Sequence, residues 1–272
     1  MNFIQIQGII ELGLIYSLVA IGVYLSFRVL EFPDLSVDGT FPLGAAITAA
    51  LISYGFSPWL ALACAITGGL LFGAITAFMA SYLRMLNLLA GILTMSALYS
   101  INLRVMGGRP NLSLLGEATI FSSLANYLPT NWPATLIGLA IGCLFTISLV
   151  VWFLGTELGL SIRAAGGNAH MTRAQGIDDR FMVVIGLALS NGLVALSGGL
   201  FAQVFGFADA SLGVGTIIIG LAGVIIGEAL IPSQRILTTV IAAFLGAVIY
   251  RAVIAVALNL TDVGLAASDQ IG

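Results

Sequence analysis

Long apolar runs follow one another along nearly the whole chain, separated by short polar stretches. Eight of them are candidate membrane spans, at about 8–28, 38–55, 58–82, 87–104, 133–154, 182–205, 212–231 and 237–259. A helix of about 20 apolar residues crosses a hydrocarbon core of about 30 Å. We expect helices because a lipid-exposed backbone must satisfy its own hydrogen bonds, and these runs are too long and too uniformly apolar for barrel strands. The pattern predicts an all-α, polytopic membrane protein with about eight transmembrane helices.

The composition supports a membrane protein and narrows its chemistry. Of the 272 residues, 60% are hydrophobic and 8% are charged, whereas a soluble domain carries about a quarter charged residues. Membrane lipid must therefore form part of the surroundings, and the net charge of −3 gives no indication of a nucleic-acid partner. His170, Cys64 and Cys143 do not have metal-ligand spacing, so we expect no metal and no cofactor.

The arginines predict the orientation in the membrane. All nine basic residues are arginine, and basic residues concentrate in cytoplasmic loops. If the polar stretch 155–181 lies inside and the spans alternate, six fall on the inner side, namely Arg28, Arg84, Arg163, Arg173, Arg180 and Arg235. Arg104 and Arg109 fall outside, and Arg251 lies within the last span. This bias favours a cytoplasmic 155–181 segment and an external N-terminus.

A break is expected at the start of the second span. Pro33 and Gly39 lie close together in the sequence, with Asp34, Ser36 and Asp38 between them. The side chains of Asp34, Ser36 or Asp38 can cap the helix that follows, because they accept hydrogen bonds from free N–H groups. Alternatively, a discontinuous helix lines a solute path, since unwound backbone is tolerated at membrane depth beside a cavity. The two roles can coexist.

Further polar residues inside the apolar runs extend this candidate path. Uncharged groups within the spans, among them Ser100, Asn102 and Gln203, either bond across helices or contact a solute, and both readings stay open. The candidate translocation-path residues are Asp34, Ser36, Asp38, Thr40, Ser96, Tyr99, Ser190 and Asn191. Glu228 either reaches the headgroup region or pairs with Arg235 or Arg251.

The polar stretch 155–181 contains a short helix with well-marked ends. Asn168 is a favourable N-cap and Gly176 a favourable left-handed residue just past a helix end, so a two-turn helix is expected from Ala169 to Gln175. Such a helix either docks into a groove on a soluble partner or lies at the membrane interface with solvated charges. The candidate docking residues are Asn168, Ala169, His170, Met171, Thr172, Arg173, Ala174, Gln175 and Gly176.

Several motifs resemble one family of transport proteins. GLSIRAAGGN at 159–168, Gly-Ile at 176–177 and NGLVALSGGL at 191–200 resemble the signature of the branched-chain-amino-acid and ribose-type permeases of bacterial ABC importers. PDLSVDG at 33–39 resembles the second-helix motif of the same family. Its continuation FPLGAA, with TMSALYSINLRVMGGRPNLSLL at 94–115, is most similar to the subgroup of tryptophan/tyrosine-type permeases. The resemblance covers nearly the whole chain.

The resemblance implies a transport subunit that works with partners. Residues 1–272 would form a single transmembrane permease domain in the bacterial inner membrane and would pair with a second copy. Cytoplasmic ATPase subunits would hold the 168–176 helix as a coupling helix, and a periplasmic or lipid-anchored solute-binding protein would deliver cargo. The path would follow the dimer axis or the subunit centre, near the broken second helix. Family members usually continue with another apolar stretch, so a C-terminal span is expected to be missing here.

The expected function is ATP-driven import of a small solute, an aromatic or branched-chain amino acid. The chain has no G-x-x-x-x-G-K-[ST] loop, no lysine and no nucleophile–base pair, so we expect a non-enzymatic subunit whose partner hydrolyses ATP. The alternative is a secondary transporter or channel without an ATPase, which would recruit Asp34, Asp38 or Glu228 for ion coupling. A membrane scaffold is a third class, which solute-dependent uptake into vesicles would exclude.

Overall fold

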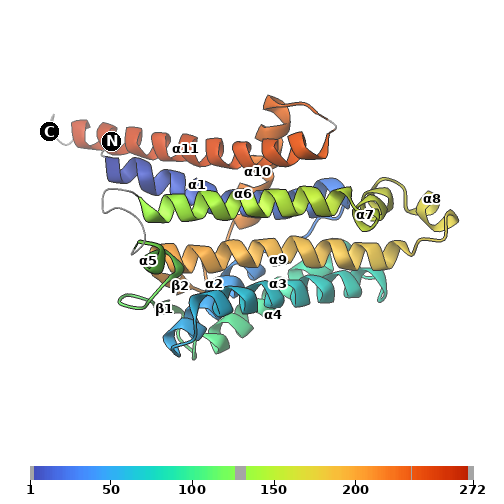
Figure 1. Cartoon of the computed structure of the whole chain (residues 1–272), viewed down its shortest axis with the longest axis horizontal. Helices are drawn as coiled ribbons and strands as arrows, with labels where there is room; N and C mark the ends of the chain where they lie inside the picture. The colour runs from blue at the N-terminus through green and yellow to red at the C-terminus, as the bar shows by residue number, and fades with distance from the viewer. Residues whose placement is uncertain (1–2, 126–132, 234, 269–272) are drawn as a thin grey trace.

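Apolar helices laid side by side make up most of the protein (Figure 1). The computed structural model describes residues 3–125, 133–233 and 235–268. The first half contains α1 (Phe3–Val23), the π-helix η1 (Tyr24–Val29), α2 (Val37–Ser53), α3 (Pro58–Ser81), α4 (Asn87–Val105), β1 (Asn111–Ser113) and α5 (Ile120–Ala125). The second half contains α6 (Ala134–Gly155), α7 (Glu157–Gly167), α8 (Ala169–Ala174), α9 (Asp179–Phe205), β2 (Phe207–Asp209), α10 (Thr216–Leu230) and α11 (Ile236–Ser268).

All eight apolar runs form helices, but within the described residues only six are long and apolar enough to cross a membrane. These six are α1 continued by η1, α3, α4, α6, α9 and the 236–258 part of α11. The other two, α2 and α10, have 17 and 15 residues. The all-α, polytopic class is confirmed, whereas the count of eight spans is not, because α2 and α10 are shorter than the other apolar helices and α10 begins only at Thr216.

The long helices run between two ends of the molecule that differ in structure (Figure 1). At one end, β1 pairs antiparallel with β2, and Leu112 lies opposite Ala208. The sequence pattern gave no sign of this two-stranded sheet. A hydrogen bond from the Ser211 hydroxyl holds the pKa of Asp209, in β2, below its usual value. At the opposite end, α7 and α8 lie beyond the long helices.

Helix α11 differs from the sequence prediction at its C-terminal end. The last predicted span ended at residue 259, but the backbone is helical through Ser268. Residues 269–272 lie outside the described part of the chain.

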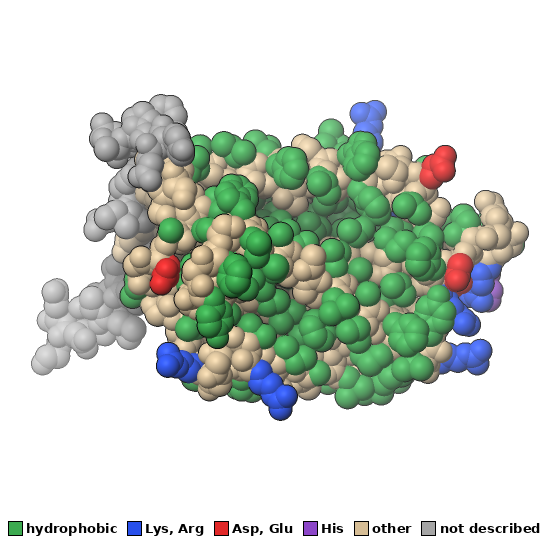
Figure 2. Space-filling view, turned by 60° about the horizontal axis from the view of Figure 1, so that its bottom comes forward, with side chains coloured by type: hydrophobic (Ala, Val, Ile, Leu, Met, Phe, Trp, Pro, Cys, Tyr) green, Lys and Arg blue, Asp and Glu red, His purple; other side chains and the backbone are tan. Residues whose placement is uncertain are grey.

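The six arginines assigned to the inner side do gather at the end that carries α7 and α8. Arg28 of η1 pairs with Glu228 of α10, and Gly166 of α7 packs against the carbonyl of Val29. The Arg180 guanidinium lies 5.9 Å from the centre of the Tyr82 ring, just after α3. On the face shown in Figure 2, the charged side chains lie mainly toward the two ends, and the surface between is largely apolar. This distribution fits a bilayer-spanning body.

Glycines allow the helices around α9 to approach closely. A Cβ on Gly73 of α3 would lie 2.8 Å from the Cβ of Asn191, and one on Gly199 of α9 would lie 2.6 Å from the Thr48 hydroxyl. A Cβ on Gly198 would overlap the Phe41 carbonyl of α2. In lipid, helix association depends on such backbone proximity, since lipid tails are as apolar as the side chains. Helix α9 is therefore the axis against which α1, α2 and α3 pack.

Replacing Gly198 by alanine should destabilise the bundle. The added methyl group has no room beside the Phe41 carbonyl, and overpacking typically costs about 1–3 kcal/mol. We expect the Gly198→Ala protein in detergent to unfold at a lower temperature than the wild type. Gly142→Ala is the matched control, because no atom lies within 4 Å of its added Cβ. Equal unfolding temperatures for the two variants would contradict this packing.

Candidate functional site

The second apolar segment starts inside the bundle, halfway along its long helices. After η1, the chain turns at Glu31, whose φ of 52° is in the left-handed region, and it is not helical again until α2 begins at Val37. The Ser36 hydroxyl lies 3.2 Å from the side-chain oxygen of Asn191, the thirteenth of the 27 residues of α9. The expected discontinuous second helix is therefore present, and its N-terminus lies at mid-depth.

A hydrogen-bond network without solvent access, which we call the sealed network, holds this break in place. It consists of the side chains of Asp34, Ser36, Thr40 and Asn191. The amide nitrogen of Asn191 donates to Asp34 Oδ2 at 2.7 Å, and the backbone N–H of Ser36 donates to Asp34 Oδ1 at 2.8 Å. The Asn191 side-chain oxygen accepts from the Thr40 hydroxyl at 2.7 Å. All four side chains are fully buried. A buried polar group without partners is costly, so this network fixes where helix α2 starts.

Asp38, at the same depth in the bundle, holds the start of another helix. Its carboxylate accepts hydrogen bonds from the backbone N–H of Ile217 at 2.7 Å and of Gly215 at 3.2 Å. Asp38 therefore caps α10, not its own helix. Gly213 packs directly on the Asp38 carbonyl, where a Cβ would overlap it. Helices α2 and α10 thus both begin at mid-depth. We call these two helices the half-helices.

Sequence reasoning missed the role of the 213–217 segment. Asp38 lies 177 residues from Gly215 in the chain, so no local pattern could indicate this contact. Ser36 is the N-cap residue of α2 by position, but its side chain makes no capping bond. Asp34 accepts from the N–H of Ser36, the residue just before α2, whereas Asp38 caps α10 and not α2.

Helix α4 supports the start of α2 from the other side. The backbone N of Leu35 lies 2.8 Å from where a Cβ on Gly91 would stand, and Met95 would meet a Cβ on Gly39 at 3.0 Å. The amide nitrogen of Asn102 donates to the Gly39 carbonyl at 3.2 Å. The break is therefore held between α9 and α4.

The structure separates the candidate path residues into two groups. Asp34, Ser36, Thr40 and Asn191 form the sealed network, and Asp38 adjoins it through α2. Ser190, beside Asn191, donates its hydroxyl to the Gly22 carbonyl at 2.7 Å. Ser96 and Tyr99 lie elsewhere, on the exposed face of α4. In this conformation the first group holds helices together, and only the second group faces outward.

The short helix at the other end begins at Ala169 as predicted and ends one residue earlier than predicted, at Ala174. The side-chain oxygen of Asn168 accepts from the Met171 N–H at 3.0 Å, and Gly176 has a φ of 83°. Gln175 is the C-cap, not the last helical residue. Thr172 is buried and faces the bundle, whereas the Met171 side chain is 64% exposed. Helix α8 therefore offers an outward face with an apolar side chain at its centre.

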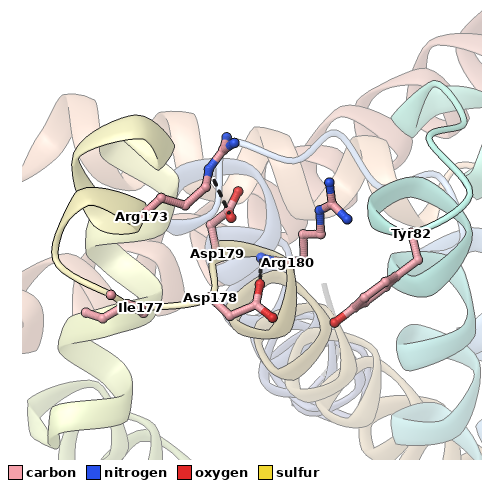
Figure 3. Close-up of a pocket in the computed structure, with 7 residues that line it drawn as sticks. Tyr82, Arg173, Ile177, Asp178, Asp179 and Arg180 are labelled. Atoms are coloured by element: carbon pink, nitrogen blue, oxygen red, sulfur yellow. Dashed lines mark hydrogen bonds and ion pairs between the residues drawn. The ribbon is translucent and has the colours of Figure 1, made fainter.

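Helix α8 is fastened to the start of α9 (Figure 3). Arg173 Nε lies 3.2 Å from Asp179 Oδ1, and Asp178 Oδ1 caps α9 by accepting from the Arg180 N–H at 3.0 Å. Arg180 in turn reaches over the ring of Tyr82. These residues line an open pocket of about 390 Å³ beside α8. The Arg173–Asp179 ion pair therefore joins α8 to the first turn of α9.

Two charged side chains in the apolar runs, Glu228 and Arg251, have partners that sequence reasoning did not give. Glu228 Oε1 accepts from Arg28 Nε at 2.8 Å, not from Arg235 or Arg251. The Arg251 guanidinium stacks 3.8 Å from the centre of the Tyr16 ring, a favourable cation–π arrangement. Among the residues that the structure describes, no group of three His, Cys, Asp or Glu could hold a metal ion.

Comparisons with known proteins agree with this architecture. Residues 5–267 match the family described as the permease component of the branched-chain amino acid transport system. The chain is 37% identical over 193 residues to the tyrosine transport system permease protein of Clostridioides difficile, a match that covers 70% of this chain and 62% of the relative. It is 40% identical over 186 residues to an uncharacterised protein of Rickettsia prowazekii, covering 68% and 63%.

A more distant relative transports a different class of solute. The ribose import permease protein of Haemophilus influenzae is 25% identical over 194 residues, which cover 70% of this chain and 55% of the relative. The chain spans less than two thirds of the length of these relatives. No solved structure matches it. The family match over nearly the whole chain, with the apolar helices, shows that the protein belongs to the permease family of branched-chain amino acid transport systems and is a multi-pass protein of the bacterial inner membrane.

Proposed function

We propose that this chain is the membrane-spanning subunit of an ABC importer that carries an amino acid into the cell, with aromatic amino acids as the first candidates. The similarity to a tyrosine transport permease supports the substrate class. The observation that carries the proposal is helix α8, a capped helix that projects exposed side chains from the arginine-rich end of the bundle. That end would be cytoplasmic by the positive-inside rule.

In this proposal, α8 is the coupling helix. Its outward residues, with Met171 at the centre, would fit a groove on a cytoplasmic ATPase subunit, as amphipathic helices fit apolar grooves. When two ATPase subunits bind ATP and close against each other, they would push on α8. Because Arg173 pairs with Asp179, the push would pass into α9. No ATP chemistry is assigned to this chain.

Helix α9 would carry the displacement to the break. A helix advances about 1.5 Å per residue, so Asn191 lies roughly 18 Å from the start of α9 at Asp179. Any shift of α9 along its axis changes the fit of Asn191 to Asp34 and Thr40. The half-helices would then move against the long helices, since packed interfaces switch between discrete arrangements. We assign the alternation between outward-open and inward-open states to this step.

The proposed assembly has further partners. A second copy of the chain would complete the transmembrane unit, and two ATPase subunits would cover the α8 end. A periplasmic or lipid-anchored binding protein would deliver cargo at the opposite end, where β1, β2 and α5 lie.

A secondary transporter is the competing class, and it would need carboxylates free to exchange ions. Asp34 is held by Asn191 and Ser36, and Asp38 by the amides of α10, which favours structural roles for both. Purification from the native membrane distinguishes the classes. An ATPase subunit that stays bound in detergent supports the importer, and ATP-independent uptake by the chain alone contradicts it.

Variants of the coupling helix should separate ATP hydrolysis from transport. Ala174→Asp adds a charge to the outward face of α8, and Gly176→Val places a β-branched residue at a φ of 83°, which strongly disfavours it. We expect both proteins to insert normally and to lose at least about tenfold of ATP-driven uptake, which corresponds to about 1.4 kcal/mol of coupling free energy. The measurement is uptake of labelled tyrosine, tryptophan and leucine into proteoliposomes, with ATPase activity assayed in parallel.

The control for these variants is Gly155→Ala, at the end of α6, where no atom lies within 4 Å of the added Cβ. It should transport like the wild type. Wild-type uptake by both Ala174→Asp and Gly176→Val would refute the coupling role of α8.

The network around Asn191 can be tested by a double-variant comparison. Asn191→Leu leaves the buried Asp34 carboxylate without its 2.7 Å hydrogen bond, at a cost of about 1–3 kcal/mol for each buried polar group left unpaired. We expect lower thermal stability and no uptake. The double variant Asp34→Leu with Asn191→Leu should regain part of the stability, because no unpaired carboxylate remains, but it should still not transport.

In the double variant, stability is therefore expected to recover in part while transport stays absent. Ser148→Ala, on the exposed face of α6, removes a hydroxyl that bonds only within its own helix and serves as the neutral control. Normal uptake by the double variant would show that the network is structural only.

A further inference from the structure

Arg251 places a positive charge deep inside the membrane. It is the sixteenth of the 23 residues of the span Ile236–Leu258, so at about 1.5 Å per residue it lies roughly 22 Å and 10 Å from the two ends. Its guanidinium lies over the ring of Tyr16, which is the twelfth of the 25 residues of the span Gln5–Val29. Helices α1 and α11 lie side by side (Figure 1). The charge is therefore held at mid-depth and does not extend to either membrane surface.

No carboxylate among the described residues neutralises this charge. The ion pairs within that part of the chain join other groups, namely Arg28 with Glu228 and Arg173 with Asp179. Glu11, on the same helix as Tyr16, accepts instead from the Thr135 hydroxyl at 2.6 Å. The Nε atom of Arg251 is buried and donates no hydrogen bond within the described residues. A cation in hydrocarbon without an anionic partner is costly and points to a function.

Stacked rings hold the guanidinium and join it to the start of α2. The guanidinium lies 3.8 Å from the centre of the Tyr16 ring, a favourable cation–π arrangement. Tyr16 in turn stacks on Phe41, with ring centroids 5.4 Å apart and an interplanar angle of 17°. Both rings are buried, whereas Arg251 is partly exposed. A ligand can therefore reach Arg251 from the side away from Tyr16.

Depth and charge together select the kind of ligand. Lipid phosphates lie in the headgroup region outside the hydrocarbon core, so they do not reach a guanidinium held at mid-depth. An anion that arrives there must be carried into the membrane by the transport path. Every amino acid has an α-carboxylate, and a guanidinium binds a carboxylate through two parallel hydrogen bonds.

We propose that Arg251 binds the α-carboxylate of the transported amino acid at mid-depth, with the Tyr16 ring holding the guanidinium in place. The inference rests on the proposed function and assigns to it a residue that selects solutes with a carboxylate. It places this part of the path beside α1 and α11 and outside the sealed network, whose side chains are fully buried. Phe41 directly follows Thr40 of that network in α2, so the stacked rings connect the carboxylate site to the half-helices.

Removal of the charge tests the role of Arg251 in uptake. In the importer assembled with its ATPase and binding protein, Arg251→Gln should lose at least about tenfold of labelled tyrosine uptake, the order of effect of a hydrogen bond to a charged group. Arg251→Lys keeps the charge but loses the paired geometry, so it should retain part of the uptake with a higher KM. Val253→Ala, at a 60% exposed position of the same helix, should transport like the wild type. Wild-type uptake by Arg251→Gln would overturn the proposal.

A reporter cysteine one turn away separates ligand binding from folding. Cys64 would be replaced by alanine, whereas Cys143 can remain because its side chain is only 1% exposed. Ala255→Cys places a thiol four residues from Arg251 on the same face of α11. In the permease–ATPase complex without binding protein, a charged methanethiosulfonate should label this thiol. Val253→Cys is the control and should stay unlabelled, because its exposed side faces lipid.

Protection of the reporter identifies the ligand chemistry. Excess tyrosine should slow the labelling of Ala255→Cys, whereas tyramine, which has the ring and the amine but no carboxylate, should not. Adding Arg251→Gln should abolish the protection by tyrosine while the thiol still reacts, which shows that the protein is folded. Equal protection by tyramine, or protection that survives Arg251→Gln, would overturn the proposal. So would an Ala255→Cys thiol that never reacts, because another segment of the assembly then covers Arg251.

Failure of this inference can be told apart from failure of the proposed function. A complex that retains the ATPase and imports tyrosine equally well with Arg251→Gln leaves the importer intact and removes the carboxylate site. A wild-type chain that never binds an ATPase removes the importer before any variant is compared.

Discussion

The structure depends on how backbone and side-chain polar groups are satisfied where two helices begin inside an apolar bundle. A helix start leaves N–H groups without intrahelical partners, and lipid supplies none. Asp34 binds the Ser36 N–H beneath α2, and Asp38 binds the Gly215 and Ile217 N–H groups of α10. The two carboxylates thereby make two half-helices possible at mid-depth.

This arrangement joins two properties that a transport subunit needs. Long helices packed through glycines make rigid bodies, with α9 as the shared axis. The half-helices α2 and α10 meet at a polar joint, where Asp38 of α2 accepts hydrogen bonds from the N–H groups of Gly215 and Ile217. Through Asn191 the joint is connected to α9, and through α9 to α8. A chain of contacts therefore runs from α8, the proposed contact with the ATPase, through α9 to the joint of the two half-helices.

Much of the fold could be predicted from the sequence, and the features that the sequence analysis missed have a common cause. Apolar runs predicted the eight helices, Asn168 and Gly176 bounded α8, and Pro33 with Gly39 located the break. The missed features all depend on contacts between distant segments: Asp38 with α10, β1 with β2, and Glu228 with Arg28. Local patterns report the preferences of a residue, but its partner is set by packing. The sequence also could not tell the sealed Asn191 from the exposed Ser96, because both are polar residues in apolar runs.

Hydrogen–deuterium exchange of the assembled transporter tests the central claim most directly. Peptides that cover residues 34–40 and 213–218 would be followed in lipid nanodiscs, with and without ATP. The account predicts slow exchange of both segments without nucleotide, because amides in both are hydrogen-bonded to Asp34 or Asp38, and faster exchange of both when ATP engages α8. Rapid exchange without nucleotide, or a response of α8 to ATP that leaves both segments unchanged, would contradict it.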